Sequence, residues 1–169
     1  MFSDLSPTLI AAAVLGGYLI GSIPFGVLVM RAAGVAVACL KDGLSQSNFY
    51  SAQLHDMVAY HDFEGITIHA EEGPRVLQSI GRKPAVILRN HGLLSWGQTL
   101  EQTFAILWTL QRACEIQLAS DAGAGPNRRI APEILRGVPA SRVAGSEAVH
   151  RQIFEAMLRK AHAELLQRP

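Results

Sequence analysis

The chain has 169 residues, enough for one ordinary domain or for a membrane anchor joined to a small domain. Its formal net charge is +1, which gives no indication of a nucleic-acid partner, and we expect none. Hydrophobic residues make up 49% of the chain and charged residues 17%, so it is more apolar than a typical soluble protein. This apolar excess is concentrated near the N-terminus.

Leu9–Met30 is a run of 22 residues without a charged side chain, long enough to span a bilayer as a helix. Arg31 follows directly, and the positive-inside tendency would place residues 33–169 in the cytoplasm, anchored to the inner membrane by residues 9–30. A signal peptide is disfavoured, because a basic N-terminal region is missing and the run is too long. A buried helix of a globular core stays open as an alternative.

This run contains the motif Gly17-Tyr18-Leu19-Ile20-Gly21-Ser22-Ile23-Pro24-Phe25-Gly26. With it, the first 34 or so residues resemble the opening helix of bacterial acyl-phosphate:glycerol-3-phosphate acyltransferases, which are multi-span membrane enzymes. The resemblance implies an inserted first helix. The Gly-Ser-Gly-Asn-type loop that follows in that family is absent here, so the acyltransferase activity is not carried over.

After residue 32 the pattern changes to that of a mixed α/β chain. We expect a small-residue helix that ends at Gly43, a plausible C-cap, and then a polar stretch with a short helix. Strands and a further short helix with acidic residues at its start should follow. The expected segments are, in order, helix Ala33–Gly43, the polar stretch Ser45–His55, strands within Met57–Phe63 and Ile66–His69, and helix Glu71–Ile80.

The most informative stretch is a strand, a polar turn and a second strand. Ala85–Leu88 is a short apolar run after a proline, which is typical of a buried strand, and Leu93–Trp96 predicts another. Between them stands Arg89-Asn90-His91-Gly92, whose glycine can adopt backbone conformations closed to other residues. A histidine at this place is held rigidly and can point into a cleft, as a metal ligand does. A turn histidine bonded to backbone is the open alternative.

The remaining chain predicts two long helices joined by a linker. Thr99–Ser120 begins with Thr99 as N-cap and Gln102 three residues later, a capping-box arrangement, and its aromatic stripe is interpreted as core. Asp121–Pro132 is rich in Gly, Pro, Asn and Arg and lacks periodicity, as a linker does. Ser146–Gln167 is expected to be the final helix.

The other candidate groups give weaker indications of chemistry. The six histidines form no His-x-His, His-Glu-x-x-His or His-x-x-x-His motif, so there is no compact metal motif. His61-Asp62 with Glu64 is either a site fragment or a solvated turn. His150 and His162, on the last helix, are expected at the surface. The two cysteines, Cys39 and Cys114, are interpreted as buried free thiols and not as a disulfide.

Four motifs in sequence resemble the class II aldolase/adducin family, in that family's order and over residues 33–169. They are Val35-Ala36-Val37-Ala38-Cys39-Leu40-Lys41-Asp42-Gly43-Leu44, Val58-Ala59-Tyr60-His61-Asp62-Phe63-Glu64-Gly65, Leu88-Arg89-Asn90-His91-Gly92-Leu93-Leu94-Ser95-Trp96-Gly97 and Gln111-Arg112-Ala113-Cys114-Glu115-Ile116-Gln117. The resemblance implies an α/β/α sandwich, homotetramers with active sites between subunits, and a small, phosphorylated sugar-type substrate. It also implies a divalent metal, often zinc, held by three histidines, of which His91 matches the third.

In that family the metal polarises a substrate carbonyl and stabilises the enediolate formed when a C–C bond breaks. The other two histidines form a His-x-His element just before the helix expected from Ala33, but residues 28–32 here read Leu-Val-Met-Arg-Ala. The acid/base glutamate and the phosphate-binding loops would also lie upstream. The resemblance therefore predicts a metal site in which His91 stands without its partners.

The sequence predicts an apolar N-terminal helix over residues 1–32 joined to a partial α/β/α sandwich over residues 33–169. Metal-dependent aldol cleavage, impaired by the missing ligands, is the first functional hypothesis. A non-catalytic, membrane-tethered assembly module is the second, because the adducin branch of the family is not enzymatic. An acyltransferase fragment and a fusion product without a function of its own are the remaining two. With half of the sandwich missing, we expect the sheet edge at Ala85–Leu88 to lack a partner strand.

Overall fold

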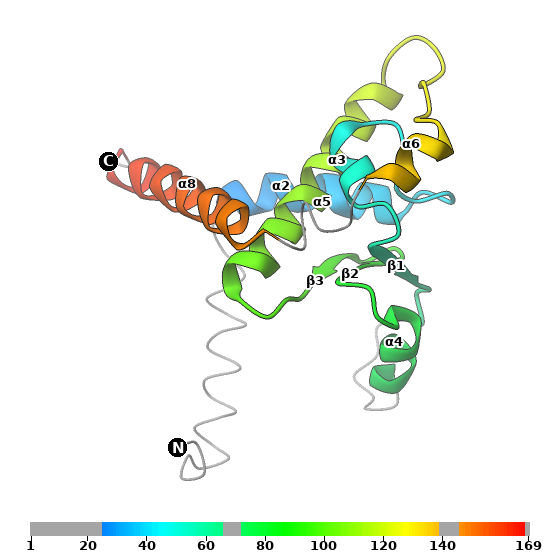
Figure 1. Ribbon diagram of the computed structural model, residues 1–169, viewed down its shortest axis with the longest axis horizontal. Helices are drawn as coiled ribbons and strands as arrows, with labels where there is room; N and C mark the ends of the chain where they lie inside the picture. Colours follow the sequence, from blue (N-terminus) through cyan, green and yellow to red (C-terminus); the bar gives the residue numbers. More distant parts are fainter. Residues whose placement is uncertain (1–24, 66–71, 139–145, 168–169) are drawn as a thin grey trace.

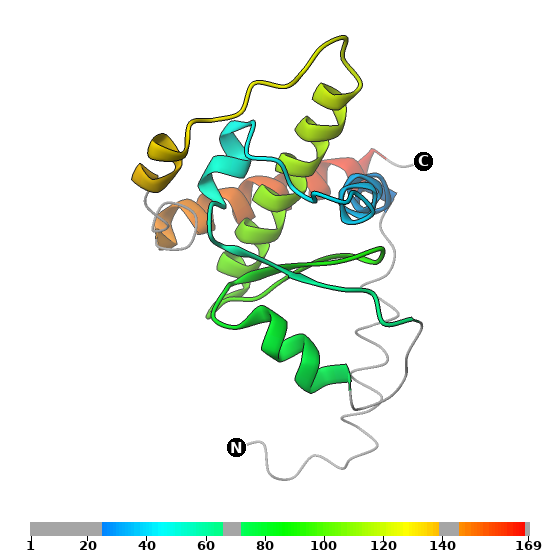
Figure 2. The same cartoon turned by 90° about the vertical axis from the view of Figure 1, so that its right-hand side faces the viewer.

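The computed structural model describes residues 25–65, 72–138 and 146–167. These residues form three layers, with a small sheet in the middle (Figures 1 and 2). Figure 2 shows helix α4 on one side of the sheet and helices α2, α3, α5 and α8 on the other. The α/β content and this layering agree with the predicted fold class. The elements are α2 (Phe25–Ala38), α3 (Phe49–Gln53), β1 (Val58–His61), α4 (Glu72–Ile80), β2 (Ala85–Leu88), β3 (Gly92–Ser95), α5 (Leu100–Asp121), α6 (Pro132–Gly137) and α8 (Glu147–Leu166).

The sheet has the order β1-β2-β3. Strand β1 pairs in parallel with β2, with Ala59 opposite Val86, and β2 pairs antiparallel with β3, with Val86 opposite Leu94. The expectation that Ala85–Leu88 would lie unpaired at an edge is wrong, because two neighbouring segments of this same chain supply both partner strands. The edges of the described sheet are β1 and β3.

Alternation along the strands divides the core between two faces. Ala85 and Ile87 pack with residues of α2 and α5 in the larger cluster, which includes Ile106 and Leu110, and all four are fully buried. Val86 faces the opposite way and packs with Ala59 and Ile80 under α4. Because the α4 cluster is much smaller, most of the hydrophobic stabilisation comes from the face covered by α2 and α5.

Helix α5 is the central element of the larger cluster and begins as predicted. The Thr99 hydroxyl accepts a hydrogen bond from the backbone N–H of Gln102, which satisfies one of the free N–H groups of the first turn. Its aromatic side chains make interhelical contacts: Phe104 meets Phe154 of α8 edge-on, and Trp108 meets Tyr50 of α3. The interpretation of this stripe as core holds for Ala113 and Cys114, which are fully buried, but Phe104 and Trp108 are only half-buried.

Helix α2 runs without a break from Phe25 to Ala38, across the boundary predicted at residues 32 and 33. Most of the predicted membrane helix, residues 9–24, lies outside the described residues. Within the ranges that the structure describes, no helix is long and apolar enough to cross a membrane. Close to its C-terminal end α2 lies on β3, where Gly34 permits the approach: a Cβ there would stand 2.6 Å from Leu93 Cδ1.

The structure differs from the sequence prediction at the end of one helix and in one additional helix. The helix predicted to end at Gly43 ends at Ala38, and the following turns bring Gly43 to a φ of 67°, beside the Tyr60 ring. Helix α6 was not predicted, because Pro132 was interpreted as the end of a linker, whereas it lies in the first turn of a short helix. The predicted strand Ile66–His69 lies outside the described residues.

Candidate functional site

The turn between β2 and β3 presents His91 on a fixed backbone. The backbone N–H of His91 donates to the Leu88 carbonyl at 3.1 Å, and that of Asn90 donates to the Ala38 carbonyl at 3.1 Å. Asn90 has a φ of 58°, a left-handed conformation that asparagine tolerates better than most residues. The turn is thereby attached to the C-terminal end of α2, and the His91 side chain is exposed to solvent.

Arg89 is a second anchor of this turn, and sequence reasoning missed it. Its backbone N–H donates to the His61 carbonyl at 2.8 Å, and its guanidinium donates to the Leu40 carbonyl at 2.7 Å. The same guanidinium lies 4.4 Å from the centre of the Tyr60 ring, within cation–π range. These contacts join the turn to β1 and to the segment after α2. No local sequence signal could have found them, because they depend on the pairing of β1 with β2.

The donor set around His91 does not fit a tightly held metal ion. Among the residues that the structure describes, no group of three His, Cys, Asp or Glu side chains lies close enough to hold one. Residues 28–32, where the family resemblance would place a His-x-His pair, form part of helix α2 and contain no metal-ligating side chain. His69 lies outside the described residues. One exposed imidazole is far fewer than the three protein ligands of a catalytic zinc site.

His61 belongs to a different group of residues, on the α4 face of the sheet. Its side chain is 7% exposed, and its Nδ1 lies 2.9 Å from the Ser79 hydroxyl of α4. That hydroxyl donates to the Arg75 carbonyl, so it accepts from His61 Nδ1–H. The other ring nitrogen, Nε2, is buried without a hydrogen-bond partner and lies 3.8 Å from a carboxylate oxygen of Glu64. The structure thus does not bring His61 together with His91.

Glu64 and Arg75 complete this group. The Arg75 Nε donates to both Glu64 oxygens, at 2.9 and 2.8 Å, and these hydrogen bonds lower the pKa of the Glu64 carboxyl, with the charges of Arg75 and His61 acting in the same direction. The ion pair fastens α4 to the loop that follows β1. Residues 62–65 are exposed, as the solvated-turn alternative predicts, whereas His61 is buried and Glu64 makes a structural contact with α4.

Three further predicted positions can be placed. His150 is 3% exposed, between α8, α3 and α5, so its predicted surface position is wrong, whereas His162 is exposed as expected. The surface prediction is wrong because His150 lies in the first turns of α8, and these turns pack on α5. Both cysteines are free, but only Cys114 is buried; Cys39 follows the end of α2 and is exposed.

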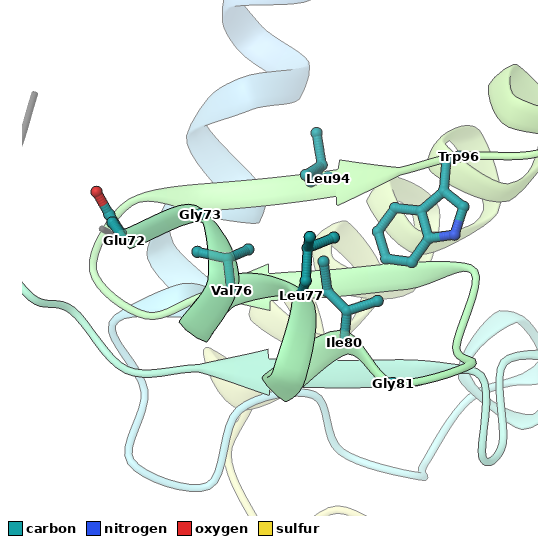
Figure 3. A pocket seen from close by; sticks show the side chains of 8 residues that line it. All are labelled: Glu72, Gly73, Val76, Leu77, Ile80, Gly81, Leu94 and Trp96. Carbon is teal, nitrogen blue, oxygen red and sulfur yellow. The ribbon is translucent and has the colours of Figure 1, made fainter. Parts of the chain in front are cut away.

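An apolar groove lies on the α4 face, between α4 and β3. It has a volume of about 740 Å³ and is lined by Glu72, Gly73, Val76, Leu77, Ile80, Gly81, Leu94 and Trp96. Figure 3 shows the side chains of Val76, Leu77 and Ile80 on one wall, with Leu94 and Trp96 opposite. Glu72 is the one charged residue of this lining, and it stands at the end of the groove. The groove offers apolar contact and hardly any polar chemistry.

Comparison with known proteins places this chain in a family of similar sequences. The model of the "Class II Aldolase and Adducin N-terminal domain" matches residues 29–118. A Pseudomonas aeruginosa protein, PA3430, provisionally named as a class 2 aldolase, is 39% identical over 106 residues, which cover 63% of this chain and 41% of that protein. Mouse alpha-adducin is 38% identical over 140 residues, which cover 75% of this chain and 19% of alpha-adducin. The chain thus spans less than half the length of these curated relatives.

Solved structures agree on the fold. The crystal structure of an aldolase II superfamily protein from Pseudomonas syringae superposes with a TM-score of 0.71 at 32% identity, over 78% of this chain and 53% of that one. An L-fuculose 1-phosphate aldolase from Glaciozyma antarctica gives a TM-score of 0.57 at 24% identity, over 76% and 50% of the two chains. The second likeness supports the fold alone.

Proposed function

The chain belongs to the class II aldolase and adducin family, and from this premise we propose that it carries the third-ligand turn of an aldolase-type metal centre without the rest of that centre. The observation behind the proposal is the contrast at the β2–β3 turn. His91 is held there by its backbone hydrogen bond to Leu88 and by that of Asn90 to Ala38 of α2, while the described residues supply no second and third ligand. We therefore expect weak or no metal-dependent aldol cleavage by this chain alone.

The family resemblance suggests what a complete centre would do. A divalent ion, zinc in many members, would be held by His91 and two further histidines and would stabilise the negative charge that develops on a substrate carbonyl oxygen. The substrate would be a small, phosphorylated hydroxy-carbonyl compound. Since one exposed imidazole does not fit that ion, no reaction step is assigned to the residues of this chain.

A non-catalytic role in assembly is the second candidate, and a specific feature favours it. Strand β3 is an edge of the described sheet, and the apolar groove beside it includes Leu94, which is 44% exposed. Exposed edges and apolar patches are surfaces on which other chains dock. Homotetramers are expected from the family resemblance, and alpha- and gamma-adducin are among the relatives. On this proposal the chain binds copies of itself or a longer family member.

An activity assay with a matched variant tests the first proposal. The purified full chain and His91→Ala would be loaded with zinc and incubated with a panel of phosphorylated ketoses and aldoses, and released aldehyde would be measured. We expect both proteins to give the rate of the zinc-only blank. Turnover by the original chain that is lost in His91→Ala would overturn the proposal. Light scattering after size-exclusion chromatography, on the chain alone and mixed with a full-length family member, tests the second proposal; a chain that stays monomeric in both samples would contradict it.

A further inference from the structure

The second half of helix α8 extends away from the rest of the domain. In its first half α8 packs on α5, where the ring of Phe154 meets that of Phe104 edge-on. Over residues 155–166 every side chain except that of Met157 is exposed. Figure 1 shows this half, drawn in red, reaching beyond the other described elements. Because tertiary packing supplies most of the stability of a helix in a protein, a helix half without packing suggests a partner.

This half of α8 has one apolar side, which we call the α8 stripe. It consists of Leu158, Ala161 and Leu165, whose spacings of three and four residues place them on the same side of the helix. Leu158 is 53% and Leu165 63% exposed. Two ion pairs, each between residues four positions apart, lie outside the stripe. An amphipathic helix with its apolar side in solvent has the form that docks into apolar grooves.

The groove between α4 and β3 has a matching length and character. Its α4 wall is a helix of nine residues, which span about 12 Å, and the α8 stripe from Leu158 to Leu165 spans about 10 Å. Leu77 on that wall is 69% exposed, and Leu94 on β3 faces it across the groove (Figure 3). Three apolar side chains from a helix would cover both leucines, whereas a polar segment would find hardly any partners.

The stripe and the groove of one chain cannot meet each other. Figure 2 shows α4 on one side of the sheet and α8 on the other. Because its first turns are held on α5, the second half of α8 cannot reach across the sheet to α4. A contact between the two surfaces therefore requires two copies of the chain.

The charges of the two surfaces are complementary. Glu72 is the one charged residue of the groove lining and stands at the end of the groove. On α8, Arg159 and Lys160 directly follow Leu158, the first residue of the stripe. A copy seated with Leu158 at the Glu72 end of the groove brings basic side chains close to this carboxylate. The charges thus favour one direction of the docked helix over the reverse.

We propose that the α8 stripe of one chain docks into the groove between α4 and β3 of a second copy. This inference rests on the second candidate function, the role in assembly, and names the surface on each side of the contact. The two surfaces differ, so the contact is head-to-tail, and every chain can bind two neighbours, one through its stripe and one through its groove. Contacts of this kind close into rings or continue as filaments.

Photo-crosslinking in the full chain tests the proposal. The photoreactive residue p-benzoylphenylalanine replaces Leu165 of the stripe; the matched control replaces Ala163, which is exposed on the opposite side of α8. An equal mixture of isotope-labelled and unlabelled chain is irradiated, so that crosslinks between chains are distinguished from those within one chain. We expect crosslinks from position 165 to residues 72–81 or 94–96 of another chain, and none to these residues from position 163. Crosslinks from position 165 to other residues only, or none, would overturn the proposal.

Light scattering on the same samples separates this inference from the function on which it rests. Oligomers whose crosslinks from position 165 lie outside the groove would overturn the docking of α8 and leave the role in assembly standing. A chain that stays monomeric, both alone and mixed with a full-length family member, would overturn both.

A pair of blocked variants gives an independent readout. Leu77→Asp blocks the groove, and Leu158→Asp with Leu165→Asp blocks the stripe; all three leucines are exposed, so far-UV circular dichroism should stay unchanged. We expect each variant alone to be monomeric and their equal mixture to form a dimer of twice 18.3 kDa, because one intact groove then meets one intact stripe. The control Ala163→Asp should assemble as the original chain does. A mixture that stays monomeric, or a blocked variant that still assembles, would contradict the proposal.

Discussion

At the scale of single residues, the position of His91 depends on its neighbours and not on its own side chain. Arg89 and Asn90 bind the backbone of β1 and of the α2 end, and the imidazole itself stays in solvent. A residue held in this way can serve as a ligand without reorganisation, provided that other ligands are delivered to it. The conformation of the turn therefore requires a residue at position 90 that tolerates a φ of 58°.

Substitution of Asn90 tests that demand. Asn90→Val should lower the free energy of unfolding by about 1–3 kcal/mol, because a β-branched residue is strained in the left-handed region. Asn90→Gly removes the same side chain without this strain and should cost less than about 0.5 kcal/mol. Urea unfolding followed by circular dichroism compares them, and equal losses in both variants would contradict the backbone explanation.

The two thiols should differ sharply in reactivity. Burial raises the pKa of Cys114 to about 12, with the charge of Glu115 adding to the effect, whereas Cys39 is exposed. At pH 8, four units below that pKa, only about one Cys114 thiol in 10,000 is ionised. We expect a disulfide reagent to label one thiol per folded chain quickly and the second only on unfolding. In Cys39→Ser the fast reaction should vanish; two fast thiols in the original chain would refute this.

The Glu64–Arg75 ion pair predicts a pH dependence with a definite sign. The folded-state pKa of Glu64 lies below its ordinary value of 4.5, so the carboxylate stabilises the fold above that value and the contribution is lost as the pH falls through the lowered one. The urea midpoint of Glu64→Gln should therefore lie below that of the original chain at pH 7 and approach it in acid. In an Arg75→Gln background the same substitution should have a smaller pH-dependent effect, because only the charge of His61 then lowers the Glu64 pKa. A constant difference in the original background would contradict the account.

The sequence predicted the turn at His91 but not the contacts that hold this turn in place. The turn could be identified because the polar tetrapeptide Arg89-Asn90-His91-Gly92 separates two apolar runs, which is a local signal in the sequence. The contacts of Arg89 with Leu40 and Tyr60, and of His61 with Ser79, join residues 18 to 49 positions apart. Only the strand pairing places them together, so no local pattern could indicate them.

At the scale of elements, helix α5 supports most of the structure. It packs against α2, α3, α8 and β3, and six of its apolar or small residues reach 0% exposure or close to it. Its limits were predictable because Thr99 caps it and its apolar residues recur at helical spacing. Helix α6 could not be predicted in this way, because a six-residue helix is too short to show periodicity.

Two leucines of α5 provide a matched test of this role. Leu110 is fully buried and Leu107 is 37% exposed on the same helix. Leu110→Ala should lower the free energy of unfolding by about 2–5 kcal/mol, because a cavity remains where the side chain was. Leu107→Ala should cost less than half as much, since water already reaches that side chain. Similar losses on chemical denaturation would show that α5 is not the centre of the core.

At the scale of the whole molecule, the layers of an aldolase-type sandwich are present, but the sheet is narrow. Three strands are described, and β3 is open at its edge and on its α4 face. The sequence predicted strands on both sides of β2 along the chain but not that they pair with it, so the expected unpaired edge at Ala85–Leu88 is wrong. Function at this scale depends on what completes the sheet and the ligand set.

The central claim is that the chain presents one ligand of a metal centre and not a complete set. Equilibrium dialysis against micromolar zinc, with the bound metal measured by mass spectrometry, tests it on the full chain. We predict well under one zinc per chain, with the same value for His91→Ala and for the exposed control His162→Ala. One tightly bound zinc per chain that is lost in His91→Ala and kept in His162→Ala would contradict the account.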